Sequence, residues 1–366
     1  MTDPEELGAW LRLLETPGVG RESVRRLLAA FGSAQAVIAA DADARGEVVG
    51  AAPADALTDA PEHLPALLAA TLAWLADGDE ERATIALGDP RYPSALLNAP
   101  DPPLMLYAQG RIPLLQADSI AIVGSRHPTP QGAANAGAFA RELSHAGLTI
   151  VSGMALGVDA AAHAGGLDGA ASTIAVVGTG LDRVYPRRNL ALAHRIARHG
   201  LIVSEYALGA PPLAIHFPQR NRIIAGLSRG TLVVEAAVQS GSLITARLAN
   251  EAGREVFAIP GSIHSPQARG CHLLLRQGAK LVETAQDVLE ELRPAAPPRA
   301  AAMPADEATD ADPLLDALGF DPVTLDALAA RTGWGAAELS SRLLGLELDG
   351  LVARLPGQLF QRVAGR

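Results

Sequence analysis

The sequence contains one cysteine, few aromatic residues and no long apolar run. The single cysteine, Cys271, excludes a disulfide framework within the chain and predicts a reducing, cytoplasmic setting. Aromatic residues make up 4% of the 366 residues against 49% hydrophobic residues, which predicts a core of Ala, Leu, Val and Ile. No segment approaches the roughly 18 consecutive apolar residues of a membrane span, and the N-terminal residues do not resemble a signal peptide. We therefore expect no membrane partner.

Positive charge is scarce overall but concentrated in one part of the chain. The formal net charge is −10. Residues 124–280 nevertheless carry 15 Lys and Arg against 8 Asp and Glu, and the rest carries 15 against 32. Such an asymmetry indicates a local anion-binding site on an otherwise acidic protein.

Residues 1–80 contain only helical patterns. The segment LGAWLRLLE has helical spacing, and TPGVGRESVRRLLAAFGS predicts a Gly-x-Gly turn followed by an amphipathic helix. The PGVG turn is similar to a helix-hairpin-helix, but we interpret it as a packing turn. A Pro-, Ala- and Asp-rich stretch from Ala51 to Pro65 predicts a loose connection before the helix LPALLAATLAWL.

Residues 81–292 alternate between short β-branched runs and Ala/Leu-rich helical stretches. The predicted strands are TIAL, LMLY, SIAIV, LTIV, TIAVV, LIVS, TLVVE and EVFAI. From residue 119 onward each run is continuously apolar, which is typical of parallel strands buried on both faces. This pattern predicts an extended Rossmann-like, doubly wound α/β domain.

The last part of the chain is predicted to be a linker and a small domain. Residues 293–312 are rich in Pro and Ala without periodicity. Residues 313–366 show three short helical segments and a hairpin, in the order of a winged helix. Its candidate reading helix, GAAELSSRLLGLELDG, carries one Arg and three acids, which favours a structural or protein-interaction role over duplex reading.

Polar and cationic residues follow six consecutive predicted strands at the point where each ends. The segments are GSRHPTPQG, SGMALGVDAAAH, GTGLDRVYPRRN, EYALGAPPLAIHFPQRNR, AAVQSGSLITA and PGSIHSPQARG. Because parallel sheets bind ligands at the carboxyl ends of their strands, these segments predict a rim that binds oxyanions.

The segment HFPQRNRIIAGLS holds two arginines, Arg220 and Arg222, beside the aromatic Phe217. The arginines have two possible partners: carboxylates of the chain, with Glu205 and Glu235 as candidates, or phosphates from outside. Six loops with several arginines suit a row of phosphates better than one mononucleotide, and Phe217 offers a stacking face for an unpaired base. The combination favours single-stranded nucleic acid.

Catalytic patterns are weak by comparison. Asp159 and His163 lie four residues apart on a predicted helix and form either an acid–base pair or a brace of the helix N-terminus. Cys271 beside His272 is either a nucleophile or a buried thiol, and we favour the buried thiol. No His, Cys, Asp and Glu set has metal-ligand spacing, so no metal or other cofactor is expected.

The sequence resembles the DNA-processing protein A family of bacteria (DprA, also called Smf). The resemblance rests on IAIVGSRHPTPQG, VSGMALGVDAAAH, GTGLDRVYPRRN, HFPQRNRIIAGLS, VVEAAVQSGSLITARLA and EVFAIPGSIHSPQARGCHLLLRQGAKLV, in order over about residues 118–283. It implies a sterile-alpha-motif-like N-terminal domain, a Rossmann-like core and a winged-helix-like C-terminal domain.

The resemblance also implies a function and a site. It implies a non-catalytic homodimer that binds and protects single-stranded DNA and loads RecA recombinase during natural transformation, also on strands coated by single-strand-binding protein. The implied DNA-binding residues are Gly124, Ser125, Arg126, Phe217, Arg220, Asn221, Arg222, Gly241, Ser242 and Thr245. Relatives often have a basic residue near Leu156, so one cationic contact is missing here.

Two other function classes compete with this prediction. The first is a nucleotide hydrolase similar to the phosphoribohydrolases, which carry a Pro-Gly-Gly-x-Gly-Thr loop and a nearby catalytic Glu. The counterpart here, AAVQSGSLITA, lacks the Pro-Gly-Gly, and Glu235 precedes it. The second is a duplex-DNA transcription factor that would read DNA through the acidic C-terminal helix.

Overall fold

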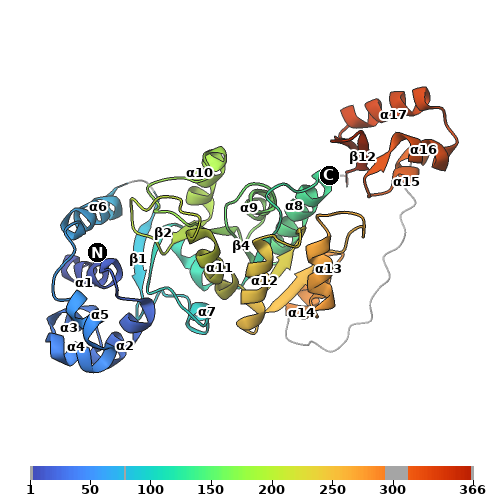
Figure 1. The fold of residues 1–366 in the computed structure, drawn as a ribbon. Coiled ribbons are helices and arrows are strands. Elements are labelled where there is room, and N and C mark those ends of the chain that lie inside the picture. The colour runs from blue at the N-terminus through green and yellow to red at the C-terminus, as the bar shows by residue number, and fades with distance from the viewer. Residues whose placement is uncertain (1–2, 78–79, 293–311, 364–366) are drawn as a thin grey trace.

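The computed structural model describes residues 3–77, 80–292 and 312–363. It contains an N-terminal helical unit, a large sheet covered by helices and a small C-terminal unit (Figure 1). Within those ranges, none of the helices combines the length and the apolar character needed to cross a membrane.

The N-terminal unit consists of six helices: α1 (Pro4–Glu15), α2 (Arg21–Phe31), α3 (Ala34–Ala39), α4 (Ala42–Val49), α5 (Ala51–Ala56) and α6 (Leu64–Ala76). Their buried core includes Leu7, Leu11 and Leu27. The loose connection predicted from Ala51 to Pro65 is wrong in its first half, which forms α5. A proline is tolerated in this helix because Pro53 lies in the first turn, where a backbone N–H has no helical partner.

The central sheet has nine strands in the order β1-β2-β6-β5-β4-β3-β7-β8-β9. The strands are β1 (Arg82–Ala86), β2 (Met105–Gly110), β3 (Ser119–Val123), β4 (Thr149–Ser152), β5 (Thr173–Val176), β6 (Leu201–Ser204), β7 (Gly230–Val233), β8 (Glu255–Ala258) and β9 (Lys280–Leu281). All eight predicted strands are present, and β3 to β8 run parallel as predicted. The sequence did not indicate β9, because two residues are too short for a pattern.

Helices cover both faces of this sheet, as the continuous apolar runs predict. One face packs against α7 (Ser94–Leu97), α11 (His216–Leu227), α12 (Ser242–Glu251) and α13 (Arg269–Arg276). The other face packs against α8 (Pro130–His145), α9 (Val158–Asp168) and α14 (Ala285–Leu292). Along β3, Ile120 and Ile122 face the second group, and Ala121 and Val123 face the first. The structure therefore confirms the doubly wound α/β prediction.

Two smaller elements complete the edge of the sheet that lies toward the N-terminal unit. They are the helix α10 (Leu190–His199) and the 3-10 turn η2 (Arg187–Asn189) that precedes it. On the same side, β1 and β2 pair antiparallel, and β2 pairs antiparallel with β6. Leu104, Met105 and Tyr107 at β2 belong to the core of the N-terminal helices. This edge therefore joins the helical unit to the sheet.

The C-terminal unit has the three helices and the hairpin that the sequence predicts, together with one further short strand. Its elements are α15 (Pro313–Leu318), β10 (Val323–Thr324), α16 (Leu325–Thr332), α17 (Ala336–Leu348), β11 (Val352–Leu355) and β12 (Leu359–Arg362). The predicted linker at residues 293–312 lies outside the described residues except for Asp312, which caps α15. Arg342 of α17 is bound by Glu338 and lies over the Trp334 ring. The only arginine of the acidic helix α17 is thus bound by residues of the C-terminal unit itself.

The contact between α8 and α9 predicts a specific sensitivity to substitution. A Cβ on Gly165 of α9 would lie 2.2 Å from the carbonyl oxygen of Gly137 on α8, so the two backbones must separate in Gly165→Ala. We expect this variant to lose on the order of 1–3 kcal/mol of unfolding free energy. The matched control is Gly137→Ala, because the nearest atom to its added Cβ is 3.8 Å away. Urea unfolding measures both, and equal midpoints for the two variants would contradict the close packing.

Candidate functional site

A cleft of about 450 Å³ lies at the carboxyl ends of β3, β4 and β7. It lies where the order of the parallel strands reverses, between β3 and β7, which is the usual ligand position in doubly wound sheets. Nine of the ten predicted site residues line it: Gly124, Ser125, Arg126, Phe217, Arg220, Asn221, Gly241, Ser242 and Thr245. Residues more than 100 positions apart in the sequence are thus brought to one place.

The loop after β3 forms one wall of the cleft. The N–H of Ser125 donates to the carbonyl of Glu235 at 2.7 Å, and the Ser125 hydroxyl accepts from the N–H of His127 at 3.1 Å. A Cβ on Gly124 would lie 2.7 Å from Val158 and 2.9 Å from the Glu235 carbonyl, so only glycine fits. This loop exposes Arg126, for which the described part of the chain provides no ion pair. An exposed, unpaired guanidinium is suited to an external anion.

The N-terminus of α12 forms the opposite wall. Gly241 precedes this helix and has no side chain to cap it. The Ser242 hydroxyl lies 2.6 Å from that of Ser240, and Asn221 donates to the Gly241 carbonyl at 3.4 Å. The first backbone N–H groups of the helix are bonded within the chain: the Ser242 N–H donates to the Ser240 hydroxyl at 3.3 Å, and the next two donate to carbonyls at 3.1 Å. The positive end of the helix dipole at this wall favours an anion.

Arg220 lies in the floor of the cleft. Its side chain packs directly on Gly153, where a Cβ would lie 1.6 Å from the Arg220 Nη1. The residue is 5% exposed, and its Nε and Nη1 find no hydrogen-bond acceptor among the described residues. Burial lowers the pKa of Arg220, while the nearby Asp159 raises it again in part. The floor therefore presents a guanidinium whose hydrogen-bonding capacity is incompletely used.

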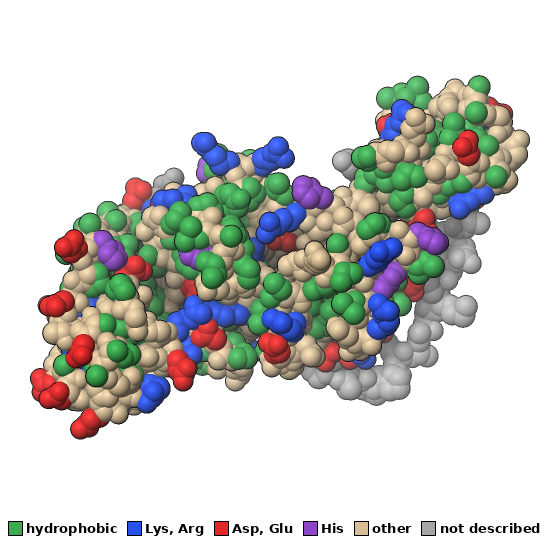
Figure 2. Space-filling view, viewed as in Figure 1, with side chains coloured by type: hydrophobic (Ala, Val, Ile, Leu, Met, Phe, Trp, Pro, Cys, Tyr) green, Lys and Arg blue, Asp and Glu red, His purple; other side chains and the backbone are tan. Residues whose placement is uncertain are grey.

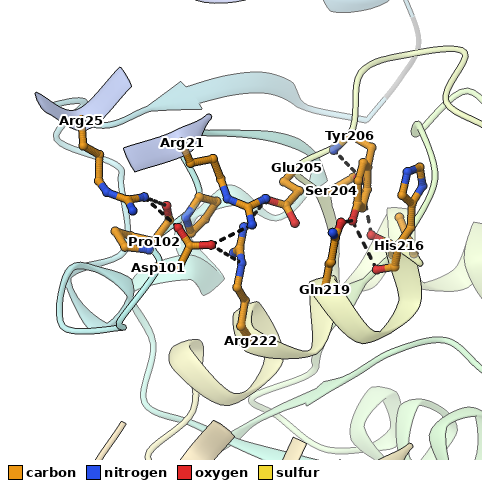
Figure 3. A network of polar contacts seen from close by, with 12 residues as sticks. Arg21, Arg25, Asp101, Pro102, Ser204, Glu205, Tyr206, His216, Gln219 and Arg222 are labelled. Atoms are coloured by element: carbon orange, nitrogen blue, oxygen red, sulfur yellow. Dashed lines mark hydrogen bonds and ion pairs between the residues drawn. The ribbon is translucent and has the colours of Figure 1, made fainter. Parts of the chain in front are cut away.

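Arg222 is the predicted site residue that the structure does not bring to the cleft. Successive helical residues are rotated by about 100°, so Arg220 and Arg222 point to opposite sides of α11. Arg222 forms ion pairs with Asp101, at 3.2 Å, and with Glu205 (Figure 3). The prediction that both arginines face one external phosphate chain is therefore corrected for Arg222, whose partners are carboxylates of the chain.

Glu235, the second candidate partner of these arginines, has a different role. Its carboxylate accepts from the Thr129 N–H at 2.9 Å and from the Thr129 hydroxyl at 2.6 Å, at the start of α8. Burial raises the pKa of Glu235, and the two bonds from Thr129 oppose that shift. Glu235 thus ties β7 to α8.

An aromatic pair that sequence reasoning left out lies at the rim of the cleft. The ring of Tyr185 packs against that of Phe217 with centroids 5.5 Å apart, and Tyr185 is 49% exposed. Arg187 and Arg188 follow it, and no ion pair is found for either within the described ranges. The segment GTGLDRVYPRRN held this signal, but only the fold places its tyrosine on Phe217.

Asp159 and His163 brace the loop after β4, and each makes its hydrogen bonds to other groups. The Asp159 carboxylate accepts from the N–H groups of Gly153, at 3.1 Å, and Ala155, at 3.2 Å. The His163 Nε2 accepts from the Met154 N–H at 3.2 Å. Burial raises the pKa of Asp159, and Arg220 offsets part of that shift. Of the two alternatives for this pair, an acid–base pair and a brace, the hydrogen bonds to the backbone favour the brace.

Cys271 is a buried thiol. It is fully buried, and its Sγ lies 3.6 Å from the Val233 carbonyl and 3.7 Å from that of Val234. Burial raises the pKa of Cys271 to about 12, which disfavours the thiolate. No group of three or more His, Cys, Asp or Glu residues in the described ranges is arranged to hold a metal ion.

Charge separates the molecule into regions. Figure 2 shows acidic side chains gathered over the N-terminal helical unit and arginines over the middle of the same face. The cationic excess of residues 124–280 thus belongs to the part of the chain that forms the cleft.

The buried imidazole of His163 predicts an acid sensitivity. Burial, with a smaller contribution from Arg220, lowers its pKa to about 3, whereas an unfolded histidine titrates near 6.5. Between these values the unfolded state binds the additional proton, so the stability that this residue contributes is lost as the pH falls below about 6.5. As the pH falls below about 6.5, we expect the unfolding free energy of wild type to decrease more steeply than that of His163→Gln, by on the order of 1.4 kcal/mol per pH unit. Urea unfolding at pH 7, 6 and 5 tests this, and identical pH dependences would contradict it.

Comparison with known proteins identifies the family. Residues 83–293 match the family described as DNA recombination-mediator protein A, residues 293–358 match the DprA winged helix domain, and residues 4–57 match the DprA-like N-terminal HHH domain. The chain is 43% identical to protein Smf of Escherichia coli over 275 residues, covering 73% of this chain and 74% of that protein. It is 49% identical to the DNA processing protein DprA of Streptococcus pneumoniae over 203 residues, covering 56% of this chain and 72% of the relative.

Two solved structures resemble more than half of this chain. The X-ray structure of DNA processing protein A from Streptococcus pneumoniae has a TM-score of 0.69 at 36% identity, covering 80% of this chain and 99% of that one. DNA processing protein A from Helicobacter pylori, described for its single-stranded DNA binding mode, has a TM-score of 0.53 at 34% identity. That match covers 58% of this chain and 96% of that one. The matched regions and the level of identity show that this chain belongs to the DNA recombination-mediator protein A (DprA) family.

Proposed function

We propose that this chain binds single-stranded DNA in the cleft between β3, β4 and β7 without reading its sequence. The observation that carries the proposal is the convergence of Arg126, Arg220 and the start of α12 at one cleft, with the Phe217–Tyr185 pair at its rim. Guanidinium groups and the positive end of a helix dipole suit phosphates, and accessible rings suit unpaired bases. The structure of the Helicobacter pylori relative, which was described for its single-stranded DNA binding mode, supports the proposal.

We further propose that the protein is a non-catalytic recombination mediator in the cytoplasm. Glu235 does not line the cleft and is bound by Thr129, and Asp159 is bound by two backbone N–H groups. Both carboxylates are therefore braces, which argues against the phosphoribohydrolase alternative. In this proposal the protein protects the incoming strand and loads RecA recombinase onto it, also where single-strand-binding protein coats the strand.

We propose that the active form is a homodimer. The apolar segment Ile223–Ala225 of α11 is buried inside the sheet domain and is not available for a dimer interface. Exposed apolar side chains lie instead near the β9 end of the sheet, including Val238, at 54% exposure, and Leu281, also at 54%. Leu243 of α12 lines a cavity of about 740 Å³ that Val238 also lines. This end of the sheet is the better candidate for self-association.

The binding proposal is tested by fluorescence anisotropy of a labelled homopolymeric single strand and an equally long duplex across a salt series. We expect tight, salt-dependent binding of the single strand, with a log–log slope near −0.7 per contacted phosphate. Arg126→Gln should weaken binding by about tenfold for every sequence and make the slope shallower by about 0.7. Arg141→Gln is the control, because Arg141 is exposed on α8 and paired with Asp168. Equal affinities for wild type and Arg126→Gln would refute the assignment.

The mediator proposal needs a second measurement. We expect the protein to shorten the lag of RecA ATPase activity on a strand coated by single-strand-binding protein, and Arg126→Gln to restore most of that lag, because loading requires the bound strand. Tight single-strand binding without any effect on the lag would leave the binding proposal standing and reject the loading role.

A further inference from the structure

Five charged residues form one ion cluster between the N-terminal unit and the sheet, called here the junction cluster. They are Arg21, Arg25, Asp101, Glu205 and Arg222. The first two come from α2, Asp101 from the segment between α7 and β2, Glu205 from the end of β6, and Arg222 from α11. Figure 3 shows the three guanidinium groups pointing toward the two carboxylates.

The two carboxylates connect α2 to α11. Asp101 accepts from Arg21 at 2.8 Å and from Arg25 at 2.8 Å, and its Oδ2 lies 3.2 Å from the Nε of Arg222. The Glu205 Oε2 lies 3.4 Å from Arg21 and also binds Arg222. Each carboxylate therefore bridges an arginine of the N-terminal unit and the arginine of α11.

The inner part of the cluster is buried, so its geometry is constrained. The side chains of Arg222 and Glu205 are 11% and 7% exposed, whereas those of Arg21 and Asp101 are 36% and 32% exposed. Burial by itself raises the pKa of Asp101, but Arg222, Arg25 and Arg21 together bring it below its usual range. Asp101 is thus ionised at neutral pH. A buried arginine between two carboxylates is held in one position, since leaving either charge unpaired is unfavourable.

The start of α11 requires such an anchor. No side chain caps the helix at Ile215, and its first turns carry Phe217 and Arg220, which line the cleft. The first turn has other tethers: the His216 Nδ1 lies 3.1 Å from the Gly178 carbonyl, and the Tyr206 hydroxyl donates to the His216 carbonyl at 3.3 Å. Arg222 is the ionic tether, two residues beyond Arg220 and on the opposite side of the helix. Uncapped helix starts fray unless tertiary contacts hold them.

We propose that the junction cluster positions α11 for single-stranded DNA, so that the N-terminal helical unit supports binding without touching the strand. Arg222, Asp101, Glu205 and Arg21 are positioning residues that act through Phe217 and Arg220. The inference rests on the proposed function of the cleft and assigns to α2 an indirect part in it.

Removal of the negative charge of Asp101 distinguishes this proposal from an alternative in which Asp101 affects DNA binding only by repelling phosphates. If Asp101 acted only through its charge, Asp101→Asn would tighten binding of a phosphate chain or leave it unchanged. Under the proposal the same change loosens the hold on Arg222 and weakens binding by about fivefold, the size of effect typical of coupled networks. The salt slope should stay that of wild type, because no phosphate contact is lost.

The experiment compares the full-length chain with Asp101→Asn and Arg21→Gln in single-strand anisotropy across a salt series. The matched control is Asp168→Asn, because Asp168 is an exposed acid that lies near two arginines, Arg141 at 3.8 Å and Arg195 at 3.7 Å, away from α11. Hydrogen–deuterium exchange of residues 216–222 without DNA gives a second readout. We expect both test variants to exchange about tenfold faster there and Asp168→Asn to match wild type. Thermal melting confirms that each variant is folded, and Arg21→Gln decides the matter if Asp101→Asn does not fold.

The outcomes are distinct. Weaker binding with an unchanged salt slope and faster exchange of α11 supports the proposal. Unchanged or tighter binding by Asp101→Asn overturns it, and so does a shallower slope for Arg21→Gln, which would mean that Arg21 touches a phosphate. If wild type itself binds no single strand, the proposed function fails. The exchange data then still decide whether the cluster anchors α11, and unchanged exchange rejects that anchoring.

Discussion

The reversal of strand order between β3 and β7 is the constraint on which the rest of the structure depends. Chain segments on the two sides of this point cross over to opposite faces of the sheet, so the loops after β3 and β7 diverge and leave a cleft between them. The strands themselves are buried on both faces, which forces polar residues to their ends. Close approach at the cleft then requires glycine at position 124, where a side chain would meet both α9 and the backbone of β7.

Helix α11 links the cleft to the remainder of the molecule because its two arginines serve different partners. Arg220 lies under the cleft with incomplete hydrogen bonding, while Arg222 on the opposite side is enclosed by Asp101 and Glu205. The Nε and Nη1 of both arginines lack a hydrogen-bond acceptor among the described residues, but only Arg222 forms ion pairs with carboxylates there. Arg220 is therefore available to a ligand, whereas Arg222 is held by ion pairs that belong to the fold.

Acidic and titratable groups around the cleft stabilise its loops. Asp159 and His163 bind backbone N–H groups of the loop after β4, and Glu235 binds Thr129 at the start of α8. Asp159 and His163 are buried and Glu235 is half-buried, and this burial shifts each pKa toward the neutral form. Perturbed titration is often a sign of catalysis, but here the same shifts accompany completed hydrogen bonds to the backbone. The cleft is thus a braced frame around the exposed Arg126, the buried Arg220 and the Phe217–Tyr185 pair at its rim.

The sequence by itself determined the alternation of helices with the strands β1 to β8 along the chain, the parallel character of β3 to β8 and the segments that hold nine cleft residues. These follow from local signals, because continuous apolar runs require burial on two faces and the ends of parallel strands meet at one edge. Only the tertiary structure decided that Arg222 turns away from the cleft, that Tyr185 packs on Phe217 and that residues 51–56 form a helix. Each of these depends on a partner distant in the sequence or on packing that overrides local propensity. Of the two carboxylates that Arg222 meets, Glu205 was a candidate from the sequence, whereas Asp101 lies 121 residues before Arg222 and no local pattern connects the two.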